Sequence, residues 1–130
     1  MRPRSRDRRR FSTRRDPSSF LWDICRAGEA IQIFVRDRSF EDYAADLLVR
    51  SAVERQFEVI GEALKQLSRQ APEIEDRIPQ ARSIIGFRNL LIHGYAAVDD
   101  AIVWRTIQED LPQLLLHVGK LLPGTDRTSQ

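Results

Sequence analysis

One run of apolar residues constrains the fold of this 130-residue chain more than any other feature. Its members recur at steps of 4, 4, 3, 4 and 3 residues, at Val49, Val53, Phe57, Ile60, Leu64 and Leu67. Steps of three and four residues place side chains on one face of an α-helix. The opposite face is charged and carries Arg50, Glu54, Arg55, Glu58 and Glu62. The segment is therefore predicted to be a long helix with one buried face.

Local signals predict where this helix begins and ends. Ser39 has Asp42 three residues later, which is a variant of the capping box that opens helices. Ala71 precedes Pro72, and a residue before proline is disfavoured in the helical region. We therefore expect one continuous helix from Ser39 to about Ala71.

Three further segments have helical signals. The first begins at Asp16-Pro17, where Asp is a capping residue and proline suits the first helical position. Its apolar stripe consists of Leu21, Ile24, Ala27, Ile31 and Phe34. A third helix is expected from about Gln80 to His93, with Gly94 as its stop and with Ile84, Ile85, Leu90 and Leu91 as its apolar members.

The fourth helix is expected to begin at a cap on Asp99 or Asp100 and to end at Gly124. Its stripe consists of Trp104, Ile107, Leu111, Leu115, Val118 and Leu122. Pro112 should bend it or remove one hydrogen bond. The stretch "PEIEDRIPQ" is interpreted as a connector with a turn of helix. No segment alternates as a strand would, so the chain is predicted to be an all-α bundle of four main helices.

The charge of the chain is unevenly distributed. Residues 1–15 hold eight arginines and one aspartate, a local charge of +7, so the net charge of +2 leaves −5 for residues 16–130. We interpret 1–15 as a basic disordered arm, 16–123 as the folded domain and 124–130 as a polar tail. No apolar run approaches the ~20 residues of a membrane helix. The lone Cys25 cannot form an internal disulfide, so a cytoplasmic, reducing setting is expected.

Most motifs of catalytic and cofactor-binding sites are missing from the sequence. There is no glycine-rich phosphate loop, and no Cys/His spacing suits a metal, so neither a cofactor nor a metal is expected. Of the two histidines, His117 lies beside an apolar stripe and is interpreted as a half-buried surface residue. His93 has polar companions in sequence and is the candidate for chemistry.

Four polar residues gather where the third helix ends, namely Arg88, Asn89, His93 and Tyr95. At ~100° per residue, Asn89 and His93 are ~40° apart, and Tyr95 would lie ~20° from Arg88 if the helix continued that far. Arginine can hold a phosphate with two parallel hydrogen bonds, and histidine can exchange a proton at neutral pH. Phosphodiester chemistry is one interpretation. An ordinary exposed helix end is the other, and spacing alone leaves both open.

The stretch "RNLLIHGY" within "IIGFRNLLIHGYAAVDDAIVW" resembles the R-x4-H-x-Y signature of HepT-like proteins in the HEPN superfamily. The stretches "RDPSSFLWDI", "AVERQFEVIGEALKQLS" and "EDLP" are similar to other parts of that family. Many members have Pro-Trp before the IIG segment, whereas here Pro79 is followed by Gln80. The resemblance covers nearly the whole chain after the arm.

The resemblance implies a homodimer in which two motifs face a shared cleft, and a metal-independent endoribonuclease toxin that cleaves tRNA or mRNA. Arg88 and His93 would be catalytic and Asn89 supporting. Tyr95 would be the residue to which a partner, a MntA-type nucleotidyltransferase antitoxin, adds AMP. A dimer also makes chemical sense, because one copy supplies one histidine and cleavage needs a base and an acid.

Two other interpretations remain. The chain could be a non-catalytic HEPN module that docks a nucleotidyltransferase, or a structural bundle in which the motif is accidental. Intact Arg88, His93 and Tyr95 favour the enzyme. Arg55, Glu58 and Glu62 could help to orient the motif, but the interpretation we favour for any one of them is a solvated helix face with pairs four residues apart.

Overall fold

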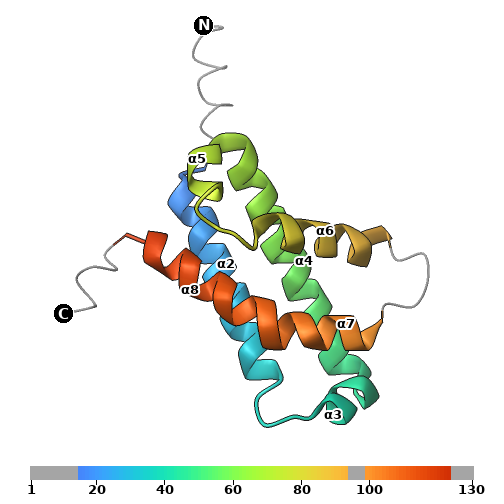
Figure 1. Cartoon of the computed structure of the whole chain (residues 1–130). Helices are drawn as coiled ribbons and strands as arrows, with labels where there is room; N and C mark the ends of the chain where they lie inside the picture. The colour runs from blue at the N-terminus through green and yellow to red at the C-terminus, as the bar shows by residue number, and fades with distance from the viewer. Residues whose placement is uncertain (1–14, 94–98, 124–130) are drawn as a thin grey trace, which may run out of the picture.

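The computed structural model describes residues 15–93 and 99–123. All regular structure in these two stretches is helical, so the prediction of an all-α fold is confirmed (Figure 1). In chain order the helices are α2 (Pro17–Phe34), α3 (Phe40–Ala45), α4 (Leu47–Gln70), α5 (Pro72–Glu75), α6 (Ala81–His93), α7 (Asp100–Arg105), the π-helical turn η1 (Thr106–Asp110) and α8 (Leu111–Leu121). None of these helices is long and apolar enough to cross a membrane.

The core is built around α4. Its six predicted stripe residues are all buried, with Val53, Phe57, Ile60, Leu64 and Leu67 at 0% exposure. Helix α2 packs along α4 and also contacts α8, while α6 crosses α4 (Figure 1). The α4–α6 crossing includes an edge-to-face pair of Phe57 and Phe87, with ring centroids 5.0 Å apart. Such pairs add to the apolar burial that holds α6 in place.

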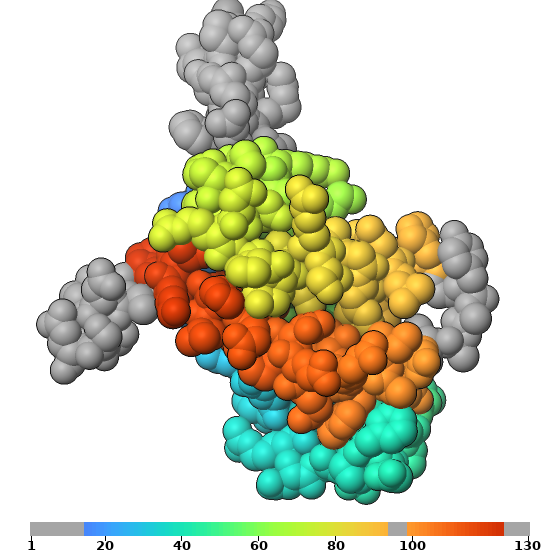
Figure 2. Space-filling view, viewed as in Figure 1, coloured from blue at the N-terminus to red at the C-terminus, as the bar shows by residue number. Residues whose placement is uncertain are grey.

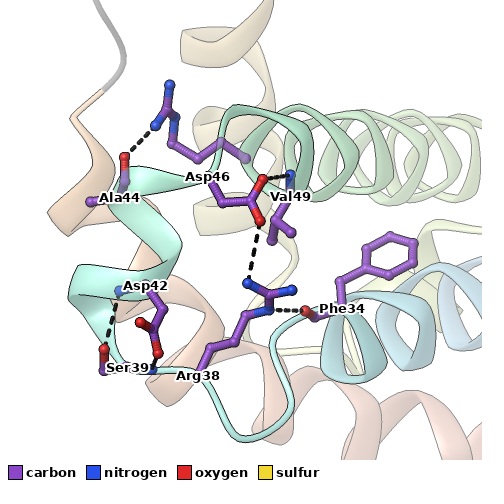
Figure 3. Close-up of polar contacts among 8 residues, drawn as sticks. Phe34, Arg38, Ser39, Asp42, Ala44, Asp46 and Val49 are labelled. Atoms are coloured by element: carbon purple, nitrogen blue, oxygen red, sulfur yellow. Dashed lines mark hydrogen bonds and ion pairs between the residues drawn. The ribbon is translucent and has the colours of Figure 1, made fainter.

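The prediction of one continuous helix from Ser39 to Ala71 is wrong, because the helix is interrupted at Asp46 (Figure 3). The capping box is present: the Asp42 amide donates to Ser39 Oγ, and the Ser39 amide donates to an Asp42 carboxylate oxygen. It opens only the short α3, however. Asp46 is extended (φ −114°, ψ 98°), and its carboxylate accepts from the Val49 amide at 3.2 Å and so caps α4 anew. Arg38 donates to the same carboxylate at 3.3 Å.

The fourth predicted helix is divided by a widened turn before Pro112. The Leu111 amide donates to the carbonyl of Thr106, five residues earlier, instead of four. Proline cannot donate, and its ring collides with the carbonyl four residues back, so the preceding turn expands. The disturbance lies where the sequence placed it. After this turn Leu114 is fully buried, and Leu115 of the predicted stripe is only partly buried.

Three smaller predictions can now be decided. The cap of α7 is Asp99, whose carboxylate accepts from the Ala101 amide at 2.9 Å. The connector does contain one helical turn, α5. Leu90, however, is not a core residue, since it is 52% exposed. The buried face of α6 consists instead of Ala81, Ile84, Phe87 and Leu91.

Candidate active site

The crossing of α4 and α6 is closest at Gly61. A β-carbon built there would overlap Cβ and Cγ of Arg88 and lie 3.0 Å from its Cδ. The stem of the Arg88 side chain therefore lies against the bare backbone of α4. Figure 2 shows α6 on the surface of the molecule, as a band beside α7 and α8. Glycine at position 61 thus sets how near the motif helix can approach the core.

The guanidinium of Arg88 is held on the polar face of α4. Its Nη2 donates to Oε1 of Glu62 at 2.9 Å, and its Nη1 donates to Oδ1 of Asn89 at 3.3 Å. The other Glu62 oxygen, Oε2, accepts from Nε2 of Gln66 at 2.9 Å. Both oxygens of this carboxylate are therefore engaged, which restrains the group that holds the guanidinium. The Arg88 side chain is only 17% exposed, so the pair is partly shielded from water.

Arg88 still has hydrogen-bonding capacity. Its Nε is buried and has no hydrogen-bond partner in the part of the chain that the structure describes. A guanidinium carries five N–H donors, of which the contacts to Glu62 and Asn89 use two. Buried polar atoms without partners are rare in proteins and often mark functional places. Nη1 and Nη2 each keep a second N–H for an oxyanion, whereas Nε is buried.

The remaining motif residues are placed only in part. Asn89 and His93 are exposed on α6, and His93 is its last residue. On an ideal helix a separation of five residues turns His93 about 140° away from Arg88. Tyr95 lies outside the described residues. One copy of the chain thus brings Arg88 and Asn89 into contact and presents His93 on another side of α6.

A groove opens beside Arg88. It has a volume of about 600 Å³ and runs between the start of α2, the polar face of α4 and α6. Among the residues that line it are Arg15, Arg55, Glu58, Gln66, Gln70 and Arg88. Arg15 is the first described residue, and it pairs with Asp23 at 2.9 Å. Glu62, for which the sequence favoured a solvated helix face over a role in orienting the motif, also lines the groove.

Two features of the structure, one in this region and one at α7, were missed in the sequence. Gly61 lies inside an otherwise helical pattern, where glycine costs ~1 kcal/mol relative to alanine and so usually has a packing reason. That signal was available. The second feature is a cluster beneath α7, in which the buried Tyr43 hydroxyl faces Glu54, Asp100 and Arg50. Burial, then the nearby Asp100, raises the pKa of Glu54.

The other candidates for chemistry are structural. Burial, followed by the charge of Glu29, raises the pKa of the Cys25 thiol, which disfavours the reactive thiolate. His117 makes a 2.8 Å contact between its Nδ1 and the Gln113 carbonyl on its own helix. In the described stretches, no group of three or more His, Cys, Asp or Glu residues could hold a metal ion.

Comparison with known proteins decides the family. The family model described as Ribonuclease HepT-like matches residues 24–121. The chain belongs to this family. A protein of Thermococcus cleftensis named "Probable ribonuclease HepT" is 38% identical over 108 residues, which is 83% of this chain and 97% of that protein.

Other relatives agree. A protein of Caldanaerobacter subterraneus that is assigned as an RNase is 35% identical over 82% of this chain and 94% of its own length. One from Methanocaldococcus jannaschii, also assigned as an RNase, is 30% identical over 82% of this chain and 96% of its own. No solved structure matches the chain. Membership of the HepT-like family confirms the predicted resemblance and, at the level of the family, the prediction of an RNA-cleaving enzyme.

Proposed function

We propose that this HepT-like chain is a metal-independent endoribonuclease toxin in which Arg88 and His93 act on RNA. One observation supports this most directly. The arginine of the family motif is clamped between Gly61 and Glu62 of α4, with N–H donors left over. A clamped guanidinium is suited to hold a phosphodiester in one orientation, because little motion remains to be lost when the phosphate binds.

The chemistry needs only a base and an acid. One histidine removes the proton from a ribose 2′-OH, and the 2′-oxygen attacks phosphorus. The bond from phosphorus to the 5′-oxygen breaks, and a second histidine protonates that oxygen. The products are a 2′,3′-cyclic phosphate and a 5′-hydroxyl. Two copies of the chain would supply the two His93 side chains, so the active species is proposed to be a homodimer with a shared cleft.

The proposed regulation lies at Tyr95. A MntA-type nucleotidyltransferase would transfer AMP from ATP to its phenol oxygen, which loses its proton as pyrophosphate leaves, and so place a negative phosphate and a purine next to the catalytic histidine. Repulsion and occlusion would both oppose RNA, whether tRNA or mRNA. Mass spectrometry of protein co-expressed with such a transferase tests this. AMP is expected on the peptide containing "NLLIHGYAAVDD" and not in a Tyr95→Phe variant. Modification at other residues alone would contradict the proposal.

The cleavage assay is the main test. His93→Ala and Arg88→Ala should each lower RNA cleavage by about 10²–10⁴-fold, as expected for loss of an acid–base or phosphate-binding group. His117→Ala is the matched control and should cleave normally, because His117 lies on α8, where its Nδ1 contacts the Gln113 carbonyl of the same helix. EDTA should have no effect. Wild-type cleavage by His93→Ala protein would refute the catalytic role of His93. An absence of cleavage by the wild-type protein would favour the alternative, a non-catalytic module that docks a nucleotidyltransferase.

A further inference from the structure

The groove beside Arg88 has no net charge. Three arginines and three carboxylates line it, so their formal charges cancel. Each arginine is also paired with one carboxylate, in the pairs Arg15–Asp23 at 2.9 Å, Arg55–Glu58 at 3.4 Å and Arg88–Glu62 at 2.9 Å. Polyanion binding depends on an excess of positive charge, which releases counterions from the phosphates. The groove as a whole is therefore poorly suited to a run of phosphates.

The uncharged parts of the groove suit a flat, neutral ligand. Val59, Ala63 and Ile92 give it apolar surface, and Ile92 is 45% exposed although it is a large aliphatic residue. The planar guanidinium of Arg15 also lines the groove and lies 4.5 Å from the centroid of the Phe20 ring. Unpaired nucleobases stack on such guanidinium and aromatic planes.

Side-chain amides provide hydrogen bonds along one wall. Nε2 of Gln70 donates to Oε1 of Gln66 at 3.4 Å, and Gln66 in turn donates to Glu62. This ladder follows α4 away from Arg88. A side-chain amide has two N–H donors and an acceptor oxygen with two lone pairs, so each rung keeps groups for a ligand. Amide and carboxylate side chains are the groups that read the edges of bases.

We propose that this groove is a base-binding subsite, which takes the unpaired nucleobase next to the phosphate held by Arg88. This inference rests on the proposed RNA cleavage for the identity of its ligand. It extends that function by naming single-stranded RNA as the substrate and Gln66 and Gln70 as residues that read the base edge. A volume of about 600 Å³ lies within the range of small-molecule sites and accommodates one nucleotide.

Binding tests the subsite without cleavage. The four nucleoside 3′-monophosphates and inorganic phosphate are titrated into His93→Ala protein, and the amide resonances are followed by NMR. The nucleotides should shift signals of Gln66, Gln70 and residues near Val59, and one base should bind best. Inorganic phosphate alone should shift only residues around Arg88. Equal binding of phosphate and all four nucleotides, with no shifts along α4, would overturn the subsite.

Two variants then test the same idea in catalysis. Gln70→Ala removes an exposed amide at the far end of the ladder and should reduce the preference between bases by about 3–10-fold, the effect of one lost hydrogen bond. Val59→Phe fills the groove and should raise KM with little change in kcat. Gln113→Ala, an exposed glutamine on α8, is the matched control and should change neither. Unchanged base preference in Gln70→Ala together with an unchanged KM in Val59→Phe would refute the subsite while leaving the proposed cleavage intact.

The outcomes separate the two proposals. Nucleotide binding in the groove by a protein that cuts no RNA would refute the proposed function and retain the subsite. The groove could instead be covered by a second copy of the chain. Sedimentation of Val59→Phe protein tests this: a loss of assembly, with no nucleotide shifts in the wild-type groove, would identify a protein contact and overturn base binding.

Discussion

Two helix contacts in this molecule are made at glycines, and they differ in what faces the glycine. At Gly61 on α4 a β-carbon would overlap Cβ and Cγ of Arg88, the root of the side chain. At Gly28 on α2 it would lie 2.5 Å from Cδ2 of Leu115, a terminal methyl group, and 3.1 Å from its Cγ. A terminal methyl can rotate away, whereas a Cβ moves only with its backbone.

The difference separates a contact that sets the position of a functional group from one that only fills space. Near Gly61 the backbone of α6 cannot move without moving Arg88 and its pair with Glu62. Near Gly28 the contact is apolar and belongs to the packing of α2 against α8. A substitution at Gly61 is therefore expected to change both RNA cleavage and the free energy of unfolding. A substitution at Gly28 is expected to change the free energy of unfolding alone.

The largest effect is expected from Gly61→Ala. Because the added methyl must push α6 away, the free energy of unfolding should fall by ~1–3 kcal/mol, as for other overpacked sites. The folded variant should also cleave RNA more slowly than folded wild-type protein, because Arg88 is displaced. Urea unfolding and cleavage rates measure the two effects. Gly86→Ala is the control: it lies on α6 with open space around it, and should gain up to ~1 kcal/mol from helix propensity. If Gly61→Ala and Gly86→Ala had similar stabilities and cleavage rates, Gly61 would have no special role in positioning Arg88.

Glu62→Gln should affect activity more than stability. The carboxylate is 47% exposed, so the ion pair adds little to folding. Loss of its charge should loosen the Arg88 guanidinium and slow cleavage by about 10-fold, the equivalent of one charge-assisted hydrogen bond. The measurement is kcat with a short RNA, and exposed Glu73→Gln is the control. Full activity of Glu62→Gln protein would show that the charge of Glu62 is not needed to position Arg88.

Gly28→Ala should change the free energy of unfolding by less than about 1 kcal/mol, because the gain in helix propensity offsets the displacement of Leu115. Cleavage should be unchanged. Thermal unfolding together with the cleavage assay checks both statements. If Gly28→Ala lowered the free energy of unfolding as much as Gly61→Ala does, the kind of atom that faces the glycine would not decide the loss of stability.

The smallest effect is expected at Glu54. Here the free energy of unfolding depends on the burial of a carboxyl group and not on a contact at a glycine. The folded-state pKa of its carboxyl is raised, first by burial and then by Asp100. Folded protein therefore keeps the proton longer than unfolded protein, and stability falls as pH rises from the ordinary pKa through the raised one. Glu54→Gln should remove this loss, so the variant should exceed wild type at pH 7 and match it at pH 4. Urea unfolding at both values provides the comparison, and a variant that is less stable at pH 7 would contradict it.

Signals that act within a few residues were readable in the sequence. The caps of Asp16 and Ser39, the helix end before Pro72 and the disturbance at Pro112 are all present. The buried stripe of α4 follows from its spacing alone. In each case the interacting groups are less than two helical turns apart, so the order of residues specifies the contact. The family motif likewise lies within one short stretch.

Contacts between segments were decided only by the tertiary structure. Asp46 is extended between α3 and α4, and its carboxylate receives Arg38 from the turn after α2, a contact that a helical pattern cannot reveal. Glu62 is one of three acidic residues on α4 that looked equivalent in sequence, and it became the partner of Arg88, 26 residues away, where the two helices cross. The crossing point depends on the packing of whole helix faces, in which Gly61 permits the closest approach. The motif was thus present in the sequence, while its orientation and the neutral groove beside it arose from how the helices pack.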